Sequence, residues 1–317
     1  MMVAAVILAH GVLSMPGTSR RDSLAALTGT EQALAVNLKR HIEVLAVHER
    51  HVRAYAHLEA AARYIETSFA AAGYAVRTQR FSTALGEVRN LEVEIRGSVR
   101  AGEIVIVGAH YDTADGTPGA NDNGSGVAAL LELARLLHAE QPARTVRLVA
   151  FVNEEPPYFK TGQMGSRVYA ARSRARNENV VAMLSLETMG YYSDQPGSQH
   201  YPPPLAWFYP DRGDFIAFVA TPPSRALLRA VVGAFRGHAT LPSEGAMLPA
   251  LLQGVDWSDH GSFAEEGYPA LMVTDTAPFR YPYYHQPQDT PDKVDAGRLA
   301  RVTAGLHHVV RALAVPQ

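Results

Sequence analysis

Short apolar runs alternate with amphipathic stretches along most of the chain. The run "GEIVIVGAHYD" (residues 102–112) is almost continuously apolar, which is typical of a strand covered on both faces. In "HLEAAARYIETSFAAAGY" (57–74), by contrast, apolar residues recur with a helical period, and Gly73 predicts where that helix stops. Strands that alternate with helices indicate an α/β fold. We therefore expect a three-layer α/β/α architecture around a mixed, largely parallel central sheet.

The same reading places the other elements. Helices are expected over 22–48, 57–72, 124–138 and 166–176, from Ser224, and from Ala296 to the end. Strands are expected at 75–83, 88–97, 102–112, 145–155, 180–188, 214–221 and 269–275, with a turn at Gly86 joining the first two. No flexible linker interrupts this alternation. We expect an N-terminal segment with helices over 1–56 that forms one globular unit with a principal domain over 57–317.

Composition narrows the possible partners. The 317 residues are 47% hydrophobic and 19% charged, with a formal net charge of −2, which is an ordinary globular balance. Near-neutral charge argues against nucleic acid or an anionic membrane as a partner bound by bulk electrostatics. The apolar stretch over 1–17 is too short to span a bilayer comfortably and leaves two interpretations open. It is an export signal, which implies a periplasmic or secreted protein, or it is the first helix of a cytoplasmic one.

Polar residues stand where the predicted strands end. In open α/β sheets, ligands bind at the carboxyl ends of the strands, so these side chains are expected to meet at one edge. The sequence has no cysteine, and any metal must therefore be held by histidine, aspartate and glutamate. The candidates, in chain order, are His110, Asp112, Asp122, Glu154, Glu155, Glu187 and His285.

Each of these residues also has a purely structural explanation. Asp122 could cap the helix that follows it, Glu187 could accept backbone hydrogen bonds, and one histidine among 13 means little alone. Together, however, they would gather several unpaired acids at one edge, which is costly unless a cation is present. A dinuclear metal site neutralises several carboxylates at once. Oxygen and nitrogen ligands without sulfur favour Zn²⁺ in an open catalytic site, with Mn²⁺ and Co²⁺ as alternatives.

An ordered set of short motifs adds a family resemblance. The set comprises "HYD", "NDNGSG", "NEE", a strand-end acid followed shortly by "MG", "SDHGSF" and "YHQPQDT". In this order the chain resembles, over roughly residues 57–315, the co-catalytic zinc aminopeptidases, which include bacterial leucine-type enzymes and have the glutaminyl cyclases as relatives. The resemblance implies a zinc-exopeptidase-like fold, two zinc ions and a peptide substrate, and it makes 57–317 the catalytic domain.

The resemblance also implies a role for each candidate. His110 and Glu187 would hold one zinc, Glu155 and His285 the other, and Asp122 would bridge the two. Three further residues would act in catalysis: Glu154 as general base, Asp112 as the carboxylate that orients His110, and Tyr284 as the group that steadies the oxyanion. The family places a cis peptide after the bridging aspartate, which implies one at Asp122–Asn123. It usually has aspartate where this chain has Glu187.

Three functions compete on this basis. The first is an aminopeptidase in which Glu154 takes a proton from an activated water and returns it to the leaving amine. The second is a glutaminyl-peptide cyclotransferase, which the resemblance links to a single zinc. The third is a non-catalytic homologue without metal, which the complete set of ligands disfavours. A zinc-to-protein ratio near two, one or zero separates them.

Overall fold

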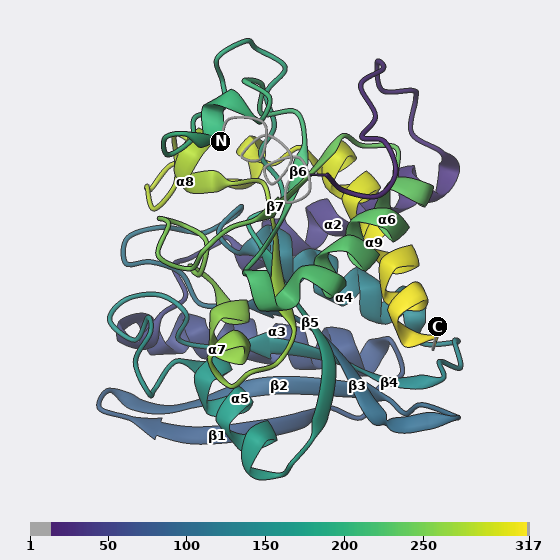
Figure 1. Ribbon diagram of the computed structural model, residues 1–317. Coiled ribbons are helices and arrows are strands. Elements are labelled where there is room, and N and C mark those ends of the chain that lie inside the picture. Colours follow the sequence, from purple (N-terminus) through teal and green to yellow (C-terminus); the bar gives the residue numbers. More distant parts are fainter. Residues whose placement is uncertain (1–13, 316–317) are drawn as a thin grey trace.

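The computed structural model describes residues 14–315, and within that range the strands form one eight-stranded sheet (Figure 1). In chain order they are β1 (Arg77–Thr83), β2 (Gly86–Ile95), β3 (Arg100–His110), β4 (Arg144–Phe151), β5 (Asn179–Glu187), β6 (Ile216–Ala220), β7 (Ser243–Met247) and β8 (Ala270–Thr274). Their order across the sheet is β1-β2-β4-β3-β5-β8-β6-β7. The central strands β4, β3, β5 and β8 run parallel, as do β6 and β7, while the other neighbours are antiparallel. The predicted mixed, largely parallel sheet is confirmed.

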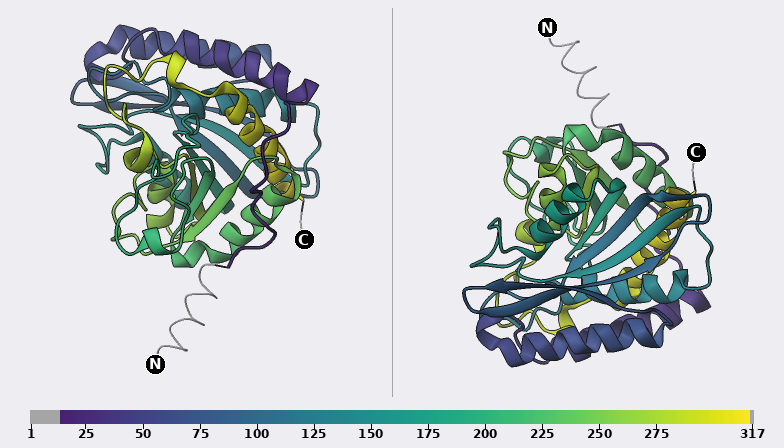
Figure 2. Two further views of the ribbon diagram at one scale, coloured as in Figure 1. Left: turned by 90° about the horizontal axis from the view of Figure 1, so that it is seen from above. Right: turned by 90° about the horizontal axis from the view of Figure 1, so that it is seen from below.

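Helices cover both faces of this sheet. They are α2 (Gly29–Leu45), α3 (Tyr55–Ala71), α4 (Gly124–Leu137), α5 (Gly165–Ala175), α6 (Arg225–His238), α7 (Asp259–Glu265), α8 (Ala277–Arg280) and α9 (Ala296–Ala314). Within the described range, short 3₁₀ helices lie at 52–54, 205–207, 222–224 and 291–293. One apolar core joins the sheet to α2, α3, α4, α6 and α9, and a second joins the opposite face to α5 and α7. Figure 2 shows these layers from two further directions. The three-layer α/β/α architecture is confirmed.

The continuous apolar run of β3 follows from this double cover. Val105 and Val107 belong to the core on one face, while Ile104 and Ile106 belong to the core on the other. Successive side chains of a strand point to opposite faces, so a strand buried on both sides has no polar positions to alternate. This burial fixes β3, and with it the position of His110 at its end.

The structure differs from the sequence-based prediction in the bounds of two elements and in three elements that were not predicted. The first helix spans Gly29–Leu45 rather than 22–48, because Thr28 and Glu31 form a capping box that sets its start. β4 ends at Phe151, so Glu154 and Glu155 lie beyond the strand and not within it. The strand β7 and the short helices α7 and α8 were not predicted at all. β7 is a five-residue strand at the sheet edge with the sequence SEGAM, which has no apolar run to reveal it.

The apolar N-terminal stretch lies mostly outside the described residues, since the description begins at residue 14. Neither interpretation of that stretch is therefore addressed, and the division at residues 56 and 57 stays a prediction. Among the helices of residues 14–315, none combines the length and apolar character needed to cross a membrane.

Candidate metal centre

Three parallel strands deliver candidate residues to the same edge of the sheet. His110 is the last residue of β3 and pairs with Phe151, the last residue of β4. Glu187 is the last residue of β5, the neighbour of β3 on its other side. Glu154 and Glu155 lie in the loop after β4, beginning three residues past its last residue. Parallel neighbours end together, so the fold gathers these acids around His110.

The loop between β3 and α4 brings in Asp122. Its neighbour Asn123 caps α4 through a hydrogen bond from the backbone N–H of Gly126 and donates to the carbonyl of Leu186 at 2.7 Å. Gly119 has a φ of +63°, and a Cβ there would collide with the carbonyl oxygen of Asp122. The loop is thus fastened to the end of β5. The Asp122–Asn123 peptide is cis, as the family resemblance implied.

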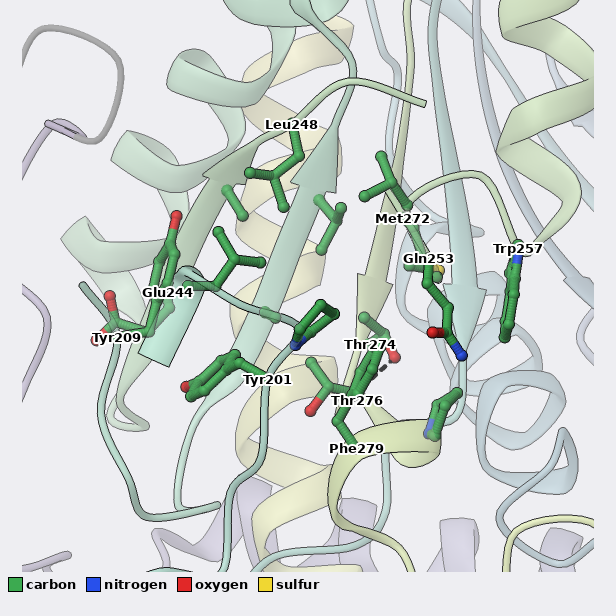
Figure 3. Close-up of a pocket in the computed structure, with 18 of the residues that line it drawn as sticks. Tyr201, Tyr209, Glu244, Leu248, Gln253, Trp257, Met272, Thr274, Thr276 and Phe279 are labelled. Carbon is green, nitrogen blue, oxygen red and sulfur yellow. Dashed lines mark hydrogen bonds between the residues drawn. The ribbon is translucent and has the colours of Figure 1, made fainter. Parts of the chain in front are cut away.

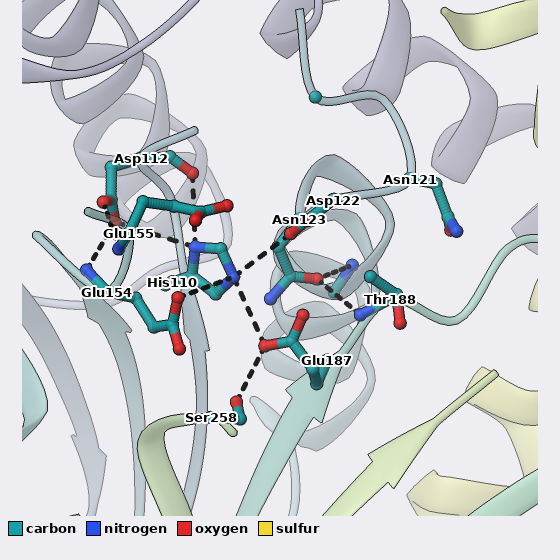
Figure 4. Close-up of polar contacts among 12 residues, drawn as sticks. His110, Asp112, Asn121, Asp122, Asn123, Glu154, Glu155, Glu187, Thr188 and Ser258 are labelled. Carbon is teal, nitrogen blue, oxygen red and sulfur yellow. Dashed lines mark hydrogen bonds and ion pairs between the residues drawn. The ribbon is translucent and has the colours of Figure 1, made fainter. Parts of the chain in front are cut away.

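Asp122 lies between the two histidines. Its Oδ1 is 3.4 Å from Nε2 of His110, and its Oδ2 is 3.1 Å from Nε2 of His285. His110 Nε2 also lies 3.3 Å from Glu187, and His285 Nε2 lies 3.2 Å from Glu155 (Figure 4 shows the His110 side). The structure therefore forms two groups, His110–Asp122–Glu187 and Asp122–Glu155–His285, that share one carboxylate. A third grouping, of His110, Glu154 and Glu155, is also close enough to hold an ion.

The facing atoms of this cluster have no hydrogen-bond partners. His110 Nε2, His285 Nε2 and both carboxylate oxygens of Asp122 are buried and unsatisfied. His110 and Asp122 are only 1% and 2% exposed. Buried polar atoms are nearly always hydrogen-bonded, so four orphaned atoms that converge on one another point to a missing ligand. Their chemistry, imidazole and carboxylate without thiolate, fits zinc.

Electrostatics point the same way. Within residues 14–315, no lysine or arginine forms an ion pair with Asp122, Glu154, Glu155 or Glu187. Burial raises the pKa of Glu154 well above its ordinary value, and the charges of Glu187 and Glu155 add to the effect. Burial lowers the pKa of His285, but the nearby carboxylates of Asp122 and Glu155 outweigh burial and raise this pKa to about 10. Without a cation, the negative charge of these buried carboxylates can be neutralised only by protons.

Asp112 supports the glutamate pair as well as His110. Its carboxylate accepts the backbone N–H groups of Glu154 at 3.1 Å and Glu155 at 3.0 Å. The Nδ1 of His110 lies 3.2 Å from the backbone carbonyl of Asp112 and 3.6 Å from its carboxylate. The backbone carbonyl is therefore the nearer hydrogen-bond acceptor for His110, while the side chain fixes the segment that presents both glutamates.

Tyr284 and Glu187 face an adjoining pocket. The ring of Tyr284 stacks on that of His285 with centroids 4.0 Å apart, and both Tyr284 and Glu187 line the pocket. Glu187 accepts a hydrogen bond of 2.7 Å from the hydroxyl of Ser258, which in turn lies 2.8 Å from the hydroxyl of Ser185. Ser258 belongs to the "SDHGSF" motif, but its contact with Glu187 was not predicted.

Two more supporting residues escaped the sequence reading. The carboxylate of Asp289 accepts the backbone N–H groups of Asn121 and Asp122 and the hydroxyl of Tyr281, joining the Asp122 loop to the loop that carries His285. Arg50 is 2% exposed and donates to four backbone carbonyls. These carbonyls belong to Leu45, Tyr111, Pro118 and Gly119. Asp289 belongs to the "YHQPQDT" motif and Arg50 to none, but the motif does not reveal the role of Asp289, because most of these contacts join segments distant in sequence.

A second cluster of acids around a histidine has a different character. His51 Nε2 lies 3.1 Å from Glu49 and 3.3 Å from Asp115. Its Nδ1 accepts the backbone N–H of Arg53, so in the neutral ring Nε2 must carry the proton. His51 Nε2 is itself buried without a hydrogen-bond partner, but the side chains of Glu49 and Asp115 are 38% and 60% exposed. Water can solvate these two carboxylates, so their charge does not require a metal, unlike the buried carboxylate of Asp122.

Comparison with known proteins agrees with this geometry. The model of "Peptidase family M28" matches residues 90–310. The uncharacterized protein YfbL of Escherichia coli is 38% identical over 304 residues, covering 93% of this chain and 90% of YfbL. A probable zinc metalloprotease of Pyrenophora teres is 28% identical over 226 residues, covering 64% of this chain but only 44% of that protein.

Solved structures share the fold at low identity. The Legionella pneumophila LapA aminopeptidase superposes with a TM-score of 0.70 at 19% identity, covering 93% of this chain and 77% of LapA. The Porphyromonas gingivalis glutaminyl cyclase superposes with a TM-score of 0.64 at 18% identity, covering 89% of this chain and 97% of the cyclase. The match of the family model spans more than half of the chain and includes every candidate ligand. The chain belongs to peptidase family M28.

Proposed function

We propose that this chain is an aminopeptidase that holds two zinc ions and removes N-terminal residues from peptides. The observation that carries the proposal is the position of Asp122, with one carboxylate oxygen toward each histidine and neither oxygen hydrogen-bonded. His110 and Glu187 would complete one ligand set, and His285 and Glu155 the other. The names of the zinc metalloprotease and aminopeptidase relatives support the choice of metal and activity.

Zinc held by these residues would polarise the scissile carbonyl and lower the pKa of a water molecule. Glu154 would accept a proton from the attacking water while the water oxygen forms its bond to the carbonyl carbon. As the C–N bond breaks, Glu154 would pass this proton to the leaving amine. Tyr284, beside His285 at the pocket, would donate a hydrogen bond to the developing oxyanion. The free α-amine of the substrate would lie beside Glu187 and Glu154.

The alternative function is glutaminyl cyclisation, because the fold is also similar to that of a glutaminyl cyclase. The resemblance links that activity to one zinc, whereas this chain has two complete ligand groups. The test combines metal analysis with two assays on the same preparation. An aminopeptidase contains about two zinc ions per chain and releases p-nitroaniline from aminoacyl-p-nitroanilides. A ratio near one, with pyroglutamate formed from a glutaminyl peptide, would instead establish the cyclase.

A further inference from the structure

A straight row of paired residues leads away from the metal centre across the sheet. Glu187 on β5 pairs with Thr274 on β8, Thr274 pairs with Ala217 on β6, and Ala217 pairs with Glu244 on β7. Residues paired directly across strands point to the same face, and all four line the pocket that adjoins the centre. Three strand spacings separate the two glutamates, so their Cα atoms lie roughly 14 Å apart.

The walls between these two acids are mainly apolar. Val219, Ala246 and Met272 extend the floor, and the segments around residues 201–209 and 276–279 cover it. Figure 3 shows Tyr209 and Glu244 together at one end of the pocket and Trp257 and Gln253 at the other. Such walls suit the methylene stem of a long side chain, whose polar end then needs a partner.

Glu244 supplies a charged end to this pocket. Among the described residues that line it, Glu187 and Glu244 are the only charged side chains, and no lysine, arginine or histidine is present. The side chain of Glu244 is 15% exposed. A partly buried carboxylate at one end of a mainly apolar pocket favours a cation or a strong hydrogen-bond donor over an apolar end group.

The present partners of Glu244 leave room for such a cation. Arg21 contacts Oε1 at 3.3 Å, but its own side chain is 69% exposed. Arg236 lies farther, at 3.9 Å, and its guanidinium is already engaged by the carbonyl and hydroxyl of Ser243. An exposed arginine exchanges readily with water, so a substrate cation can take its place at Glu244.

We propose that this pocket receives the side chain of an N-terminal lysine or arginine, with Glu244 as the residue that selects the positive end. The inference rests on the proposed aminopeptidase function and names its substrate class. An extended lysine spans roughly 6 Å from Cα to Nζ, by its five bonds of about 1.5 Å. The rest of the distance between the two Cα atoms is taken up at both ends. At one end the Glu244 side chain extends toward the substrate, and at the other the substrate Cα lies some way from the Cα of Glu187.

The test compares lysyl-p-nitroanilide with norleucyl-p-nitroanilide, because norleucine is lysine without its ammonium group. The wild-type enzyme should show a lysyl-to-norleucyl ratio of kcat/KM above about ten. Glu244→Gln, which keeps the shape but removes the charge, should lower this ratio by about ten- to a hundredfold, the usual worth of a hydrogen bond to a charged group. Arg21→Ala should raise the ratio, since it removes the competing cation. A wild-type preference for norleucyl, or an equal fall for both substrates in Glu244→Gln, overturns the inference.

A binding measurement separates this inference from the proposed function. L-Lysinamide and L-norleucinamide are titrated calorimetrically into the wild-type protein and Glu244→Gln. Suppose that neither p-nitroanilide is hydrolysed, but lysinamide binds the wild-type protein more tightly than norleucinamide does and loses this advantage in Glu244→Gln. The pocket assignment is then supported and the aminopeptidase function is overturned. If norleucyl substrate is hydrolysed and the two amides bind equally, the aminopeptidase stands and the pocket assignment falls. Absence of both hydrolysis and amide binding overturns both.

Discussion

Two acid-rich regions of this protein balance their charge in opposite ways. On the face of β2 and β4, Glu92, Glu94 and Glu178 are all largely buried, but Arg147 reaches Glu94 at 2.9 Å and Glu178 at 2.7 Å, and Arg172 reaches Glu92 at 3.2 Å. In the candidate metal centre, the only ion-pair partners of the acids among residues 14–315 are histidines. Buried glutamate thus forms structural ion pairs in one region and candidate metal ligands in the other. The presence or absence of a neighbouring arginine distinguishes the two.

The pKa directions separate the two regions clearly. Burial raises the pKa of both Glu94 and Glu178, but hydrogen bonds from Arg147 outweigh burial and leave both values below the ordinary one. At the metal centre, burial raises the pKa of Glu155 to about 7, and the charge of Asp122 contributes to the rise. Acids held by arginine stay ionised in the folded chain. Acids without such a partner need a metal ion or a proton. Water cannot take that role here, because the acids of the candidate metal centre are only a few per cent exposed.

The largest expected effect comes from removing a ligand. Glu155→Ala should lose most of the zinc from the His285 side, and with it nearly all activity and part of the thermal stability, because metal-binding free energy is also folding free energy. Zinc per chain is measured by mass spectrometry of the metal, alongside the melting temperature with and without a chelator. Full zinc content in this variant would remove Glu155 from the ligand set.

Glu154→Gln should behave differently although the residues are adjacent. The amide keeps the shape but cannot accept a proton, so kcat should fall by about 10²–10⁴-fold while both zinc ions remain. Initial rates on an aminoacyl-p-nitroanilide and the zinc content are measured on one preparation. Loss of zinc here, with retention in Glu155→Ala, would exchange the two roles.

Substitutions among the arginine-paired glutamates of β2 and β4 should change the stability of the protein and not its catalytic rate. Arg147→Met should cost about 3 kcal/mol of unfolding free energy near neutral pH, since Glu94 and Glu178 would lose their buried partner. The control is Arg80→Met, whose pair with Glu87 is 54% exposed on both sides and should cost less than about 1 kcal/mol. Urea denaturation gives both numbers, and kcat should hardly change in either variant.

The pH dependence of that loss follows from the lowered pKa values. A carboxyl with a lowered folded-state pKa adds stability above its unfolded pKa, near 4.3 for glutamate, and loses it as pH falls through the folded value. The gap between wild type and Arg147→Met should therefore narrow below about pH 4. A gap that stays constant from pH 7 to pH 3 would show that the arginine acts through packing.

The smallest effect is expected from Ser258→Ala. This change removes the hydroxyl that donates to Glu187 and should weaken zinc binding by about 10- to 100-fold, the usual range for a partner of a ligand. Ser262→Ala is the matched control, because its hydroxyl bonds Ser166 in the same region without touching a candidate ligand. Competition with a chromogenic chelator measures both affinities. If Ser258→Ala and Ser262→Ala bind zinc equally tightly, the hydrogen bond from Ser258 to Glu187 does not contribute to zinc affinity.

The sequence predicted the centre of the sheet and the edge formed by β1, but not the opposite edge formed by β7. β3 and β5 are continuous apolar runs because helices cover both of their faces. β7 contains Glu244 and Gly245 and owes its existence to pairing with β6, which no local pattern encodes. The same contrast holds at the site. His110 and Glu155 belong to motifs that follow predicted strands, and this position indicates their role. Asp289 also belongs to a motif, but its role depends on hydrogen bonds to residues more than 160 positions away, which the motif does not show.

Arg50 has a consequence for how far this catalytic unit can be shortened. The residue precedes the segment 90–310 that matches the family model, yet its guanidinium holds the carbonyls that shape the loop from Tyr111 to Gly119. Burial lowers its pKa to about 10, and the nearby charge of Asp289 offsets part of that change. A fragment trimmed to the matched segment would leave these carbonyls without a donor beneath the metal ligands. In this chain the N-terminal helical region is therefore an internal scaffold of the catalytic unit, and transplanting the site to another protein means carrying that scaffold along.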